Sequence, residues 1–528
     1  MSRSAALRPR LAASIAAGLI ALLAAAITHA QGFDVVEATI DDVHASLSNG
    51  QITCRQLVDG YLSRIAAYDK QGPALNAIQL INPRAREEAD ALDAAFASSG
   101  FVGPLHCVPV LLKDQVETSD MPTTYGSAVF AGFMSGRNAT IVTRMKDAGA
   151  IILAKTNMGE YAFSYVGSAF GMVRNAYDPT RLPSGSSAGT GAAVAASFGL
   201  VGIGEDTGGS IRGPAAVHSL VGLRPTLPLV SRYGMMPANP TQDTLGPMTR
   251  TVADTAILLD ALSGYDPNDP VTAYSVGRTP ASYRAFLDEN GLEGARIGVI
   301  REPMDPRADP ESEDYAQVRA VIDRALEDMR ALGAEIVDSV EIPLIDLVDS
   351  TYASNTFETE QATNDYLEGL PHAPVSSLKE IVLTGLVVPS REVTLMNVVG
   401  KSTSDIGYLD VMLTRERIRQ SVLAAMADAE LDALVHATFD HQTTVIPPDA
   451  LTSAARDQGY GRGNNRRLSP LIGFPAVTVP AGFTTDGLPV GIEFLGRAFS
   501  EGTLLRLTYA YEQATGRRRP PTTTPALN

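Results

Sequence analysis

Two segments rich in glycine and serine contain the residues that this sequence could use for chemistry. They are Gly185-Ser-Ser-Ala-Gly189 and Gly204-Glu-Asp-Thr-Gly-Gly-Ser-Ile-Arg212. In the second segment, consecutive glycines permit a tight turn whose backbone N–H groups point to one side. Such a nest can stabilise an oxyanion or bind a phosphate. No Gly-Lys-Ser/Thr stands at P-loop spacing, so the pattern favours an oxyanion hole with Ser210 as the attacking group.

Ser187 offers a different nucleophile, because it is the centre of a G-x-S-x-G pattern. A nucleophile elbow needs a strand directly before the serine, whereas residues 178–184 are rich in turn formers. It also needs a histidine base, and none of the seven histidines has an evident catalytic context. His436 and His441 only frame a loop. The sequence contains neither H-E-x-x-H nor a C-x-x-C pair, so we expect no metal and no cofactor.

Alternating strands and helices must position these segments. A short apolar strand is expected at 108–112, ending at Lys113, and a second at 150–154, ending at Lys155. Helical spacing of apolar residues predicts helices within 34–69, 82–97 and 140–148. Residues 183–226 carry few large side chains; a buried helix at 192–198 and a strand at 200–204 are expected there. This alternation predicts an α/β fold.

The second half of the chain predicts further elements of the same kind. Strands are expected at 296–300, 335–338, 434–436, 476–480 and 487–496, and helices at 316–332, over most of 343–440 and at 501–514. We expect pocket residues outside the two glycine-rich segments to come from 120–170 and 343–465.

Several sequence blocks, in chain order, resemble the amidase signature family of serine hydrolases. The resemblance runs from about residue 43 to residue 516. Its central blocks are Pro183-Ser-Gly-Ser-Ser-Ala-Gly-Thr-Gly-Ala-Ala, Gly204 to Ala216 and Val221-Gly-Leu-Arg-Pro-Thr226. Further blocks lie at 109–114, 174–179, 242–248 and 487–491. The resemblance implies a single large α/β/α domain over 31–519, with a central mixed β-sheet covered by helices on both faces.

The resemblance also implies the roles of individual residues. Lys113 matches the family's base, Ser186 its bridging serine and Ser210 its nucleophile. Ser187, despite its better-known motif, is therefore only a neighbour of the bridging serine. The implied oxyanion donors are the backbone N–H groups of Thr207, Gly208, Gly209 and Ser210.

The implied reaction is hydrolysis of a carboxamide C–N bond through an acyl-enzyme. A lysine ordinarily keeps its proton to about pH 10, but burial disfavours its charged form. Neutral Lys113 can then draw a proton from Ser210 through Ser186, and activity should fall at acidic pH. The partner is expected to be a small-molecule amide, and the protein a monomer or homodimer.

The chain departs from the family pattern at a few positions. Ala188 and Thr190 are mild changes that remove no catalytic hydroxyl. Glu205 stands where threonine is common, and it either tunes the site or only lies beside it. Asp206 and Arg212 are expected to brace the loop as an ion pair, while Lys155 is expected to serve structure.

The ends of the chain and its charge limit the protein's location and partners. Arg3, Arg8 and Arg10 precede an apolar run at 11–27, which predicts a signal peptide over 1–30 and export to the periplasm or medium. No second run is long enough to span a membrane. A net charge of −17 argues against a nucleic-acid partner.

Residues 520–528 are expected to form a flexible tail. Export permits a disulfide between Cys54 and Cys107, although two separate thiols fit equally well.

Three alternative functions remain at this stage. The chain also resembles the amidotransferase component that supplies ammonia for transfer RNA, although export suits that role poorly. The same machinery serves esterases and urethanases. A non-catalytic binding protein on this fold is disfavoured, because Lys113, Ser186 and Ser210 are all present.

Overall fold

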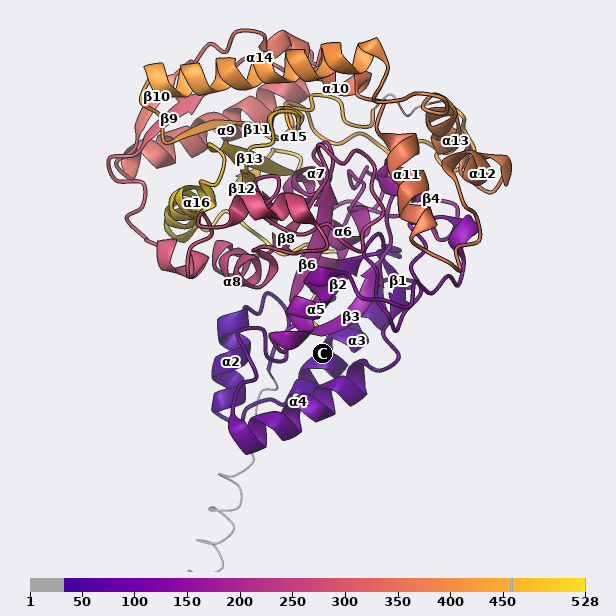
Figure 1. Ribbon diagram of the computed structural model, residues 1–528. Coiled ribbons are helices and arrows are strands. Elements are labelled where there is room, and N and C mark those ends of the chain that lie inside the picture. Colours follow the sequence, from indigo (N-terminus) through magenta and orange to yellow (C-terminus); the bar gives the residue numbers. More distant parts are fainter. Residues whose placement is uncertain (1–32, 456, 458, 528) are drawn as a thin grey trace, which may run out of the picture.

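One mixed sheet of eleven strands forms the centre of the computed structural model, which describes residues 33–455, 457 and 459–527 (Figure 1). The strand order is β1-β3-β2-β6-β8-β7-β12-β13-β11-β9-β10. These strands are β1 (Ile78–Ile81), β2 (Pro109–Lys113), β3 (Ile151–Thr156), β6 (Val201–Asp206), β7 (Val221–Arg224), β8 (Thr244–Thr249), β9 (Arg296–Val299), β10 (Glu335–Asp338), β11 (Ala433–Ala437), β12 (Ala476–Phe483) and β13 (Pro489–Leu495); β4 (Val166–Gly167) and β5 (Gly171–Met172) pair separately.

The sheet contains two parallel parts joined by antiparallel strands. Strands β3, β2 and β6 run parallel, and so do β11, β9 and β10. Between them, β8, β7, β12 and β13 pair antiparallel with their neighbours. The mixed sheet expected from the sequence is therefore confirmed.

Helices cover both faces of this sheet. On one face α6 and α7 pack against each other and on the central strands, and on the other α5, α8, α16 and α9 form a continuous layer. The helices are α2 (Ile40–Ser48), α3 (Cys54–Tyr68), α4 (Ala85–Ser99), α5 (Thr140–Asp147), α6 (Ala188–Ala195), α7 (Arg212–Val217), α8 (Val252–Leu262), α9 (Glu313–Ala331), α10 (Val348–Ser354), α11 (Thr359–Glu368), α12 (Leu378–Leu383), α13 (Pro389–Met396), α14 (Ile406–Asp428), α15 (Leu468–Ile472) and α16 (Glu501–Thr515).

The N-terminal helical region divides into two helices because each has its own start signal. Thr39 and Thr53 each accept a hydrogen bond from the third residue of the helix that follows, and Asp42 and Gln56 return the bond. Such capping boxes satisfy backbone donors that a helix start leaves free. The helical pattern seen across 34–69 is therefore α2 and α3, joined by a short turn.

Small residues allow α6 to lie directly on the sheet. A Cβ added at Gly191 would collide with Pro214 of α7, and one at Gly202 of β6 would collide with Thr190 and Val194. Strand β6 continues through Asp206, two residues beyond the strand that the sequence predicts. The alternation of side chains along a strand therefore fixes the direction of Glu205, which a turn would not do.

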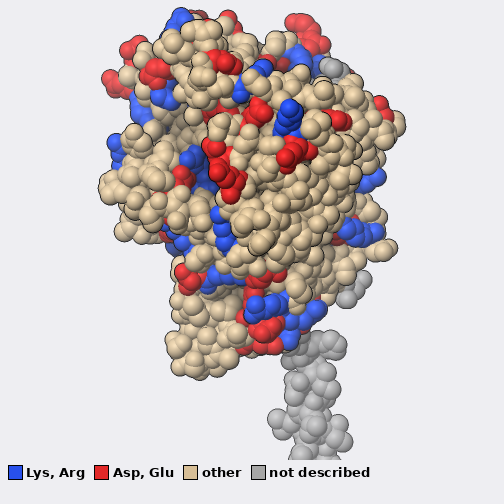
Figure 2. All heavy atoms as spheres, turned by 45° about the vertical axis from the view of Figure 1, so that its right-hand side comes forward, with Lys and Arg blue, Asp and Glu red and all other residues tan. Residues whose placement is uncertain are grey.

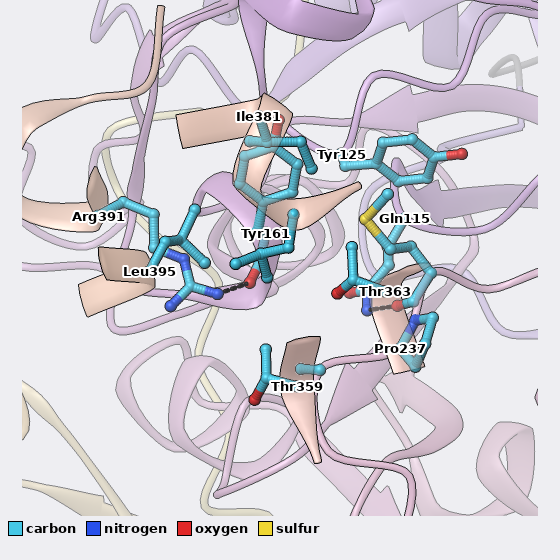
Figure 3. Close-up of a pocket in the computed structure, with 12 residues that line it drawn as sticks. Gln115, Tyr125, Tyr161, Pro237, Thr359, Thr363, Ile381, Arg391 and Leu395 are labelled. Carbon is cyan, nitrogen blue, oxygen red and sulfur yellow. Dashed lines mark hydrogen bonds between the residues drawn. The ribbon is translucent and has the colours of Figure 1, made fainter. Parts of the chain in front are cut away.

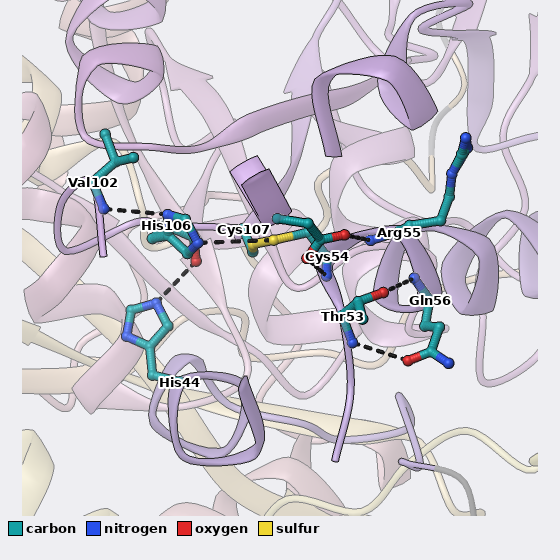
Figure 4. Close-up of a disulfide and its surroundings, with 9 residues drawn as sticks. His44, Thr53, Cys54, Arg55, Gln56, Val102, His106 and Cys107 are labelled. Carbon is teal, nitrogen blue, oxygen red and sulfur yellow. Dashed lines mark hydrogen bonds between the residues drawn. A yellow bond between two sulfur atoms is a disulfide. The ribbon is translucent and has the colours of Figure 1, made fainter. Parts of the chain in front are cut away.

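A disulfide joins Cys54, the first residue of α3, to Cys107, just before β2 (Figure 4). The Cα atoms are 5.3 Å apart, inside the usual range for a disulfide. His106 lies beside it, with Nε2 3.8 Å from the Cys54 sulfur. Of the two alternatives left open by the sequence, the bonded one is found.

Within the segment where the sequence predicts a flexible tail, 520–528, two residues are hydrogen-bonded to helix α3. The carbonyl oxygens of Thr524 and Pro525 each accept a hydrogen bond from Arg64, at 2.8 Å. Arg64 is itself buried in α3, and it anchors this segment because a buried guanidinium needs acceptors. The signal peptide expected at 1–30 lies outside the described residues.

The helices and the surface charge bear on whether the protein contacts a membrane or a nucleic acid. Among the described residues, no helix has both the length and the apolar character needed to cross a membrane. On the face drawn in Figure 2, acidic and basic side chains are interspersed rather than gathered by sign. That face therefore presents no broad basic patch, built from described residues, of the kind that binds a phosphate backbone.

Candidate active site

Lys113 ends β2 at the centre of the parallel part of the sheet, and its side chain is fully buried. Its Nζ donates a hydrogen bond to Ser186 Oγ at 2.8 Å and another to Glu205 Oε2 at 2.7 Å. Burial lowers the pKa of Lys113, and the nearby carboxylate of Glu205 opposes that change. Lys113 is therefore a buried amine in direct contact with a serine hydroxyl, as a proton acceptor must be.

Ser186 is held in a tightly packed loop directly before α6. The Gly185–Ser186 peptide bond is cis. The Ser186 carbonyl oxygen accepts a hydrogen bond from Gly159 N at 3.1 Å. A Cβ at Gly185 would overlap the carbonyl of Ser164, so no larger residue fits there. The loop therefore leaves the buried Ser186 hydroxyl facing Lys113.

Ser187 faces a different part of the fold. Its Oγ accepts from Glu205 N and donates to Glu205 O, both at 3.2 Å, so it ties the start of α6 to β6. No histidine of the described chain is hydrogen-bonded to it: His436 contacts the carbonyl of Ala437, and His441 bonds with Asp314. The G-x-S-x-G pattern thus marks a structural serine.

Ser210 follows β6 in a turn that opens on a cavity. Gly209 in this turn has a φ of +110°, a conformation that favours glycine. The backbone amides of Thr207, Gly208 and Ser210 donate to no other group of the described chain. The amide of Gly209 instead donates to Asp206 Oδ1 at 2.6 Å. The nest therefore offers three free donors, and the fourth donor expected from the resemblance is occupied.

Buried ion pairs brace this turn from behind. Asp206 lies 3.2 Å from Arg212 Nε and 3.3 Å from Arg224 Nη1, and Arg212 also pairs with Glu493. Burial opposes ionisation of Asp206, but the two arginines outweigh it and hold its pKa far below the ordinary value. The ion pair of Asp206 and Arg212 expected from the sequence is present, and it fixes the Gly209 amide.

Two further carboxyl groups lie behind Lys113. Thr207 Oγ1 is 2.6 Å from Glu205 Oε1 and 2.7 Å from Asp243 Oδ1. Burial, together with the charge of Glu205, raises the pKa of Asp243 to about 7. Asp243 precedes β8 and had no signal in the sequence beyond its place in a family block.

Lys155 is separate from this cluster, although it lies near the end of β3 much as Lys113 ends β2. Its Nζ contacts the Val116 carbonyl and donates to Thr123 Oγ1 at 3.0 Å, and Asp114 lies 3.8 Å away. Burial lowers its pKa to about 8. These contacts hold the loop after β2, in keeping with the structural role expected for Lys155.

Ser210 opens on a cavity of about 290 Å³. Aromatic and arginine side chains form much of its wall, and they come mainly from the two regions named in the sequence analysis. The wall includes Tyr161, Phe163, Tyr352, Tyr460, Arg391, Arg466 and Arg467, together with Thr207, Gly208 and Ser210. Arg466 also supports the nest, because its Nη1 donates to the Gly209 carbonyl at 2.8 Å.

A narrow apolar pocket adjoins this cavity and shares part of its wall, including Tyr161 and Arg391 (Figure 3). Arg391 stands at the junction, where it donates to the Tyr161 carbonyl at 2.7 Å. Leu378, Ile381 and Leu395 of α12 and α13 line the apolar side. The helices α12 and α13, between β10 and β11, thus supply one side of the site.

Metal-ligating residues gather at one place only within the described chain, namely Cys54, His106 and Cys107. The two cysteines are joined in the disulfide, and none of the three residues lines the cavity at Ser210. The residues around Ser210 offer no comparable group among those described.

Comparisons with known proteins agree on one family. The family model described as Amidase matches residues 56–505. A probable amidase of Arabidopsis thaliana is 31% identical over 93% of this chain and 92% of its own length. The A component of a glutamyl-tRNA(Gln) amidotransferase from an Exiguobacterium strain is 35% identical over 90% and 96%. The crystal structure of the native peptide amidase of Stenotrophomonas maltophilia is similar with a TM-score of 0.83 and 35% identity, covering 92% of this chain and 99% of that one.

Proposed function

The chain belongs to the amidase family and is an amide-hydrolysing enzyme, and from this premise we propose that Lys113, Ser186 and Ser210 carry out the reaction. The contact between the buried Lys113 Nζ and Ser186 Oγ is the observation that carries the proposal. A serine hydroxyl needs a base before it can attack an amide. Lys113 is the buried amine in contact with the serine loop, and Ser210 lies in the cavity beyond it.

The reaction then proceeds in two halves. Neutral Lys113 takes the proton of Ser186, which takes that of Ser210, while Ser210 Oγ forms a bond to the amide carbon. The resulting oxyanion accepts hydrogen bonds from the free amides of the nest. The C–N bond breaks as the relay returns the proton to the nitrogen, so ammonia or an amine leaves. Water, activated by the same relay, cleaves the Ser210 ester and releases the acid.

The three free amides of the nest suit this chemistry because they are fixed before the substrate arrives. Asp206 and its arginines hold the turn, and Arg466 holds the Gly209 carbonyl. Donors that need no rearrangement stabilise a developing charge most effectively. Asp206 and Arg466 therefore support the oxyanion hole without touching the reacting atoms.

We propose peptide C-terminal amides as the substrate class. Similar solved structures include a peptide amidase in complex with the competitive inhibitor chymostatin, at a TM-score of 0.84 and 35% identity. The cavity of about 290 Å³ has the size of a small ligand site. Its aromatic and arginine wall suits a chain of carbonyl groups with side chains. We also propose that the enzyme is exported after cleavage near Ala30.

A second candidate function is the glutaminase half-reaction of an amidotransferase, favoured by the 35% identity to a component of such an enzyme. That protein is named as one part of an assembly, whereas the hydrolase proposed here needs no partner component for its reaction. Esters and urethanes are also within reach of an acyl-enzyme mechanism. The isolated protein therefore has to be tested on each of these substrate classes and on an aryl amide.

The experiment measures ammonia or amine release from a peptide amide, a p-nitroanilide, glutamine and a urethane, and acid release from an ester. We expect the peptide amide to give the highest kcat/KM, and Ser210→Ala to abolish all turnover. Ser187→Ala serves as the matched control. Preference for glutamine, or activity that survives Ser210→Ala, would contradict the proposal.

A further inference from the structure

A buried chain of hydrogen-bonding groups extends from Lys113 away from the substrate cavity. Lys113 Nζ donates to Glu205 Oε2 at 2.7 Å. The other oxygen of Glu205 lies 2.6 Å from Thr207 Oγ1, which lies 2.7 Å from Asp243 Oδ1. The side chains of Lys113, Glu205 and Asp243 are fully buried, so water does not separate their charges. The relay of Lys113, Ser186 and Ser210 does not use this chain.

The number of protons shared by these hydrogen-bonded groups decides whether Glu205 or Asp243 carries the negative charge. The Thr207 hydroxyl has one proton and can donate to only one of its two carboxyl neighbours. The other carboxyl must therefore carry a proton and donate to Thr207 Oγ1. Below about pH 7 Asp243 is that acid, because burial and the charge of Glu205 raise its pKa to about 7. Glu205 is then the carboxylate that faces Lys113.

The position of Glu205 is imposed by the sheet. It pairs with Leu245 across the β6–β8 ladder, and its N–H and C=O groups also bond with Ser187. Both of its carboxylate oxygens have partners, at 2.7 and 2.6 Å. A side chain fixed in this way holds Lys113 Nζ within reach of Ser186.

We propose that Glu205 is a positioning residue that holds Lys113 against Ser186 and serves as the counter-charge of the proton that Lys113 accepts. The inference rests on the proposed function of Lys113 as base. When neutral Lys113 takes the proton from Ser186, the negative pair becomes a neutral ion pair. When the proton moves on to the leaving nitrogen, the first state returns. The dry interior therefore never holds an isolated ammonium, which would be costly.

The other charged groups near Lys113 each lie beside a group of opposite charge. Asp206 and Glu493 face Arg212 and Arg224 behind the nest. On the neighbouring strand, Lys155 faces Asp114. Tyr352, on the cavity side, is neutral because burial and the nearby carboxylates raise its pKa well above the ordinary value. The groups whose charge acts on Lys113 are Glu205 in contact, Asp206 at longer range and, once it loses its proton, Asp243.

The test measures the rate at which a fluorophosphonate probe modifies Ser210 as a function of pH. In the wild type the rate rises with pH as Lys113 loses its proton. Glu205→Gln removes the counter-charge, which lowers the pKa of Lys113, so the half-maximal rate should move down by about one pH unit or more. On a peptide amide, the same shift should appear in kcat/KM, with KM unchanged because Glu205 touches no substrate.

Three further variants distinguish loss of the Glu205 charge from misfolding and from the general effect of changing a buried carboxyl group. Glu205→Thr removes the same charge with a smaller side chain and replaces the glutamine variant if that variant does not fold. Glu205→Asp retains the charge and should restore the pH profile. Glu501→Gln makes the same substitution at another fully buried carboxyl, which accepts a bond from Thr226 N, and should leave the profile in place.

The possible results separate the two proposals. If the wild type is not labelled at Ser210, the proposed function fails. If the wild type is labelled and the profiles of Glu205→Gln and Glu205→Thr coincide with it, the role of Glu205 is refuted. A downward shift in both, restored by Glu205→Asp and absent in Glu501→Gln, supports it.

Discussion

Replacing each of the two adjacent serines in turn separates the competing motifs. Ser186→Ala removes the hydroxyl that accepts from Lys113 Nζ at 2.8 Å, whereas Ser187→Ala removes one that bonds only with the backbone of Glu205. Both side chains are fully buried, and each variant loses one oxygen. The pair is therefore matched in burial and in the atom removed, and it differs in the partners of the lost hydroxyl: Lys113 for Ser186 and the Glu205 backbone for Ser187.

The magnitudes follow from these contacts. Proton transfer by a positioned group contributes about 10²–10⁴ to a rate, which corresponds to roughly 2.7–5.4 kcal/mol. We expect Ser186→Ala to lower kcat by this factor. Ser187→Ala loses two hydrogen bonds of about 1 kcal/mol each. It should therefore lower the free energy of unfolding by roughly 1–2 kcal/mol and leave kcat near that of the wild type.

The assay is ammonia release from a peptide amide at saturating substrate, with thermal unfolding of both variants as the stability measurement. Wild-type kinetics in Ser186→Ala, or a greater loss of kcat in Ser187→Ala, would refute the assignment. The second result would restore the G-x-S-x-G serine as the nucleophile.

Three further predictions concern the base, the disulfide and the nest. Activity should fall as pH drops below neutral, because Lys113 becomes charged; a rate that stays flat down to about pH 5 with chemistry limiting would exclude a lysine base. Cys54→Ser with Cys107→Ser should lower the free energy of unfolding by about 4 kcal/mol, since the bond closes a loop of 53 residues; calorimetry would show no change if the thiols are free. Gly208→Ala places a Cβ against Tyr352 and should lower kcat about 10²–10³-fold by displacing an oxyanion donor, with KM changed much less.

Local sequence patterns predict the strands that end near Lys113 and Ser210, because apolar runs and small residues mark these strands. The apolar run before Lys113 is a buried strand, and the small residues of 183–226 pack α6 against β6. Strand β8 gives no such signal, since Gly246 and Pro247 interrupt it. It forms because its neighbours β6 and β7 offer ladder partners on both sides, which a local pattern does not reveal.

The surroundings of Lys113 depend on contacts that spacing does not encode. Glu205 is adjacent to the glycine-rich turn in sequence, but the extra length of β6 directs it at Lys113. Asp243 reaches the cluster from a segment 36 residues beyond Thr207. The Gly209 amide looks free in sequence, yet Asp206 occupies it. The first two contacts depend on the pairing of β6 and β8, and the third on the turn that follows β6.

The pairing of Cys54 with Cys107 shows the same limit. One cysteine begins α3 and the other precedes β2, and only the packing of these elements brings them within 5.3 Å between Cα atoms. A count of two cysteines and an expected export signal permit the bond but do not require it.

Trapping the acyl-enzyme shows whether Ser210 is the nucleophile. The enzyme would be mixed with an activated ester, quenched in acid within the first turnover and digested, and the acylated peptide located by mass spectrometry. We expect one acyl group per chain, on Ser210, and none in Ser210→Ala. An acyl group on Ser186 or Ser187, or turnover without any covalent intermediate, would contradict it.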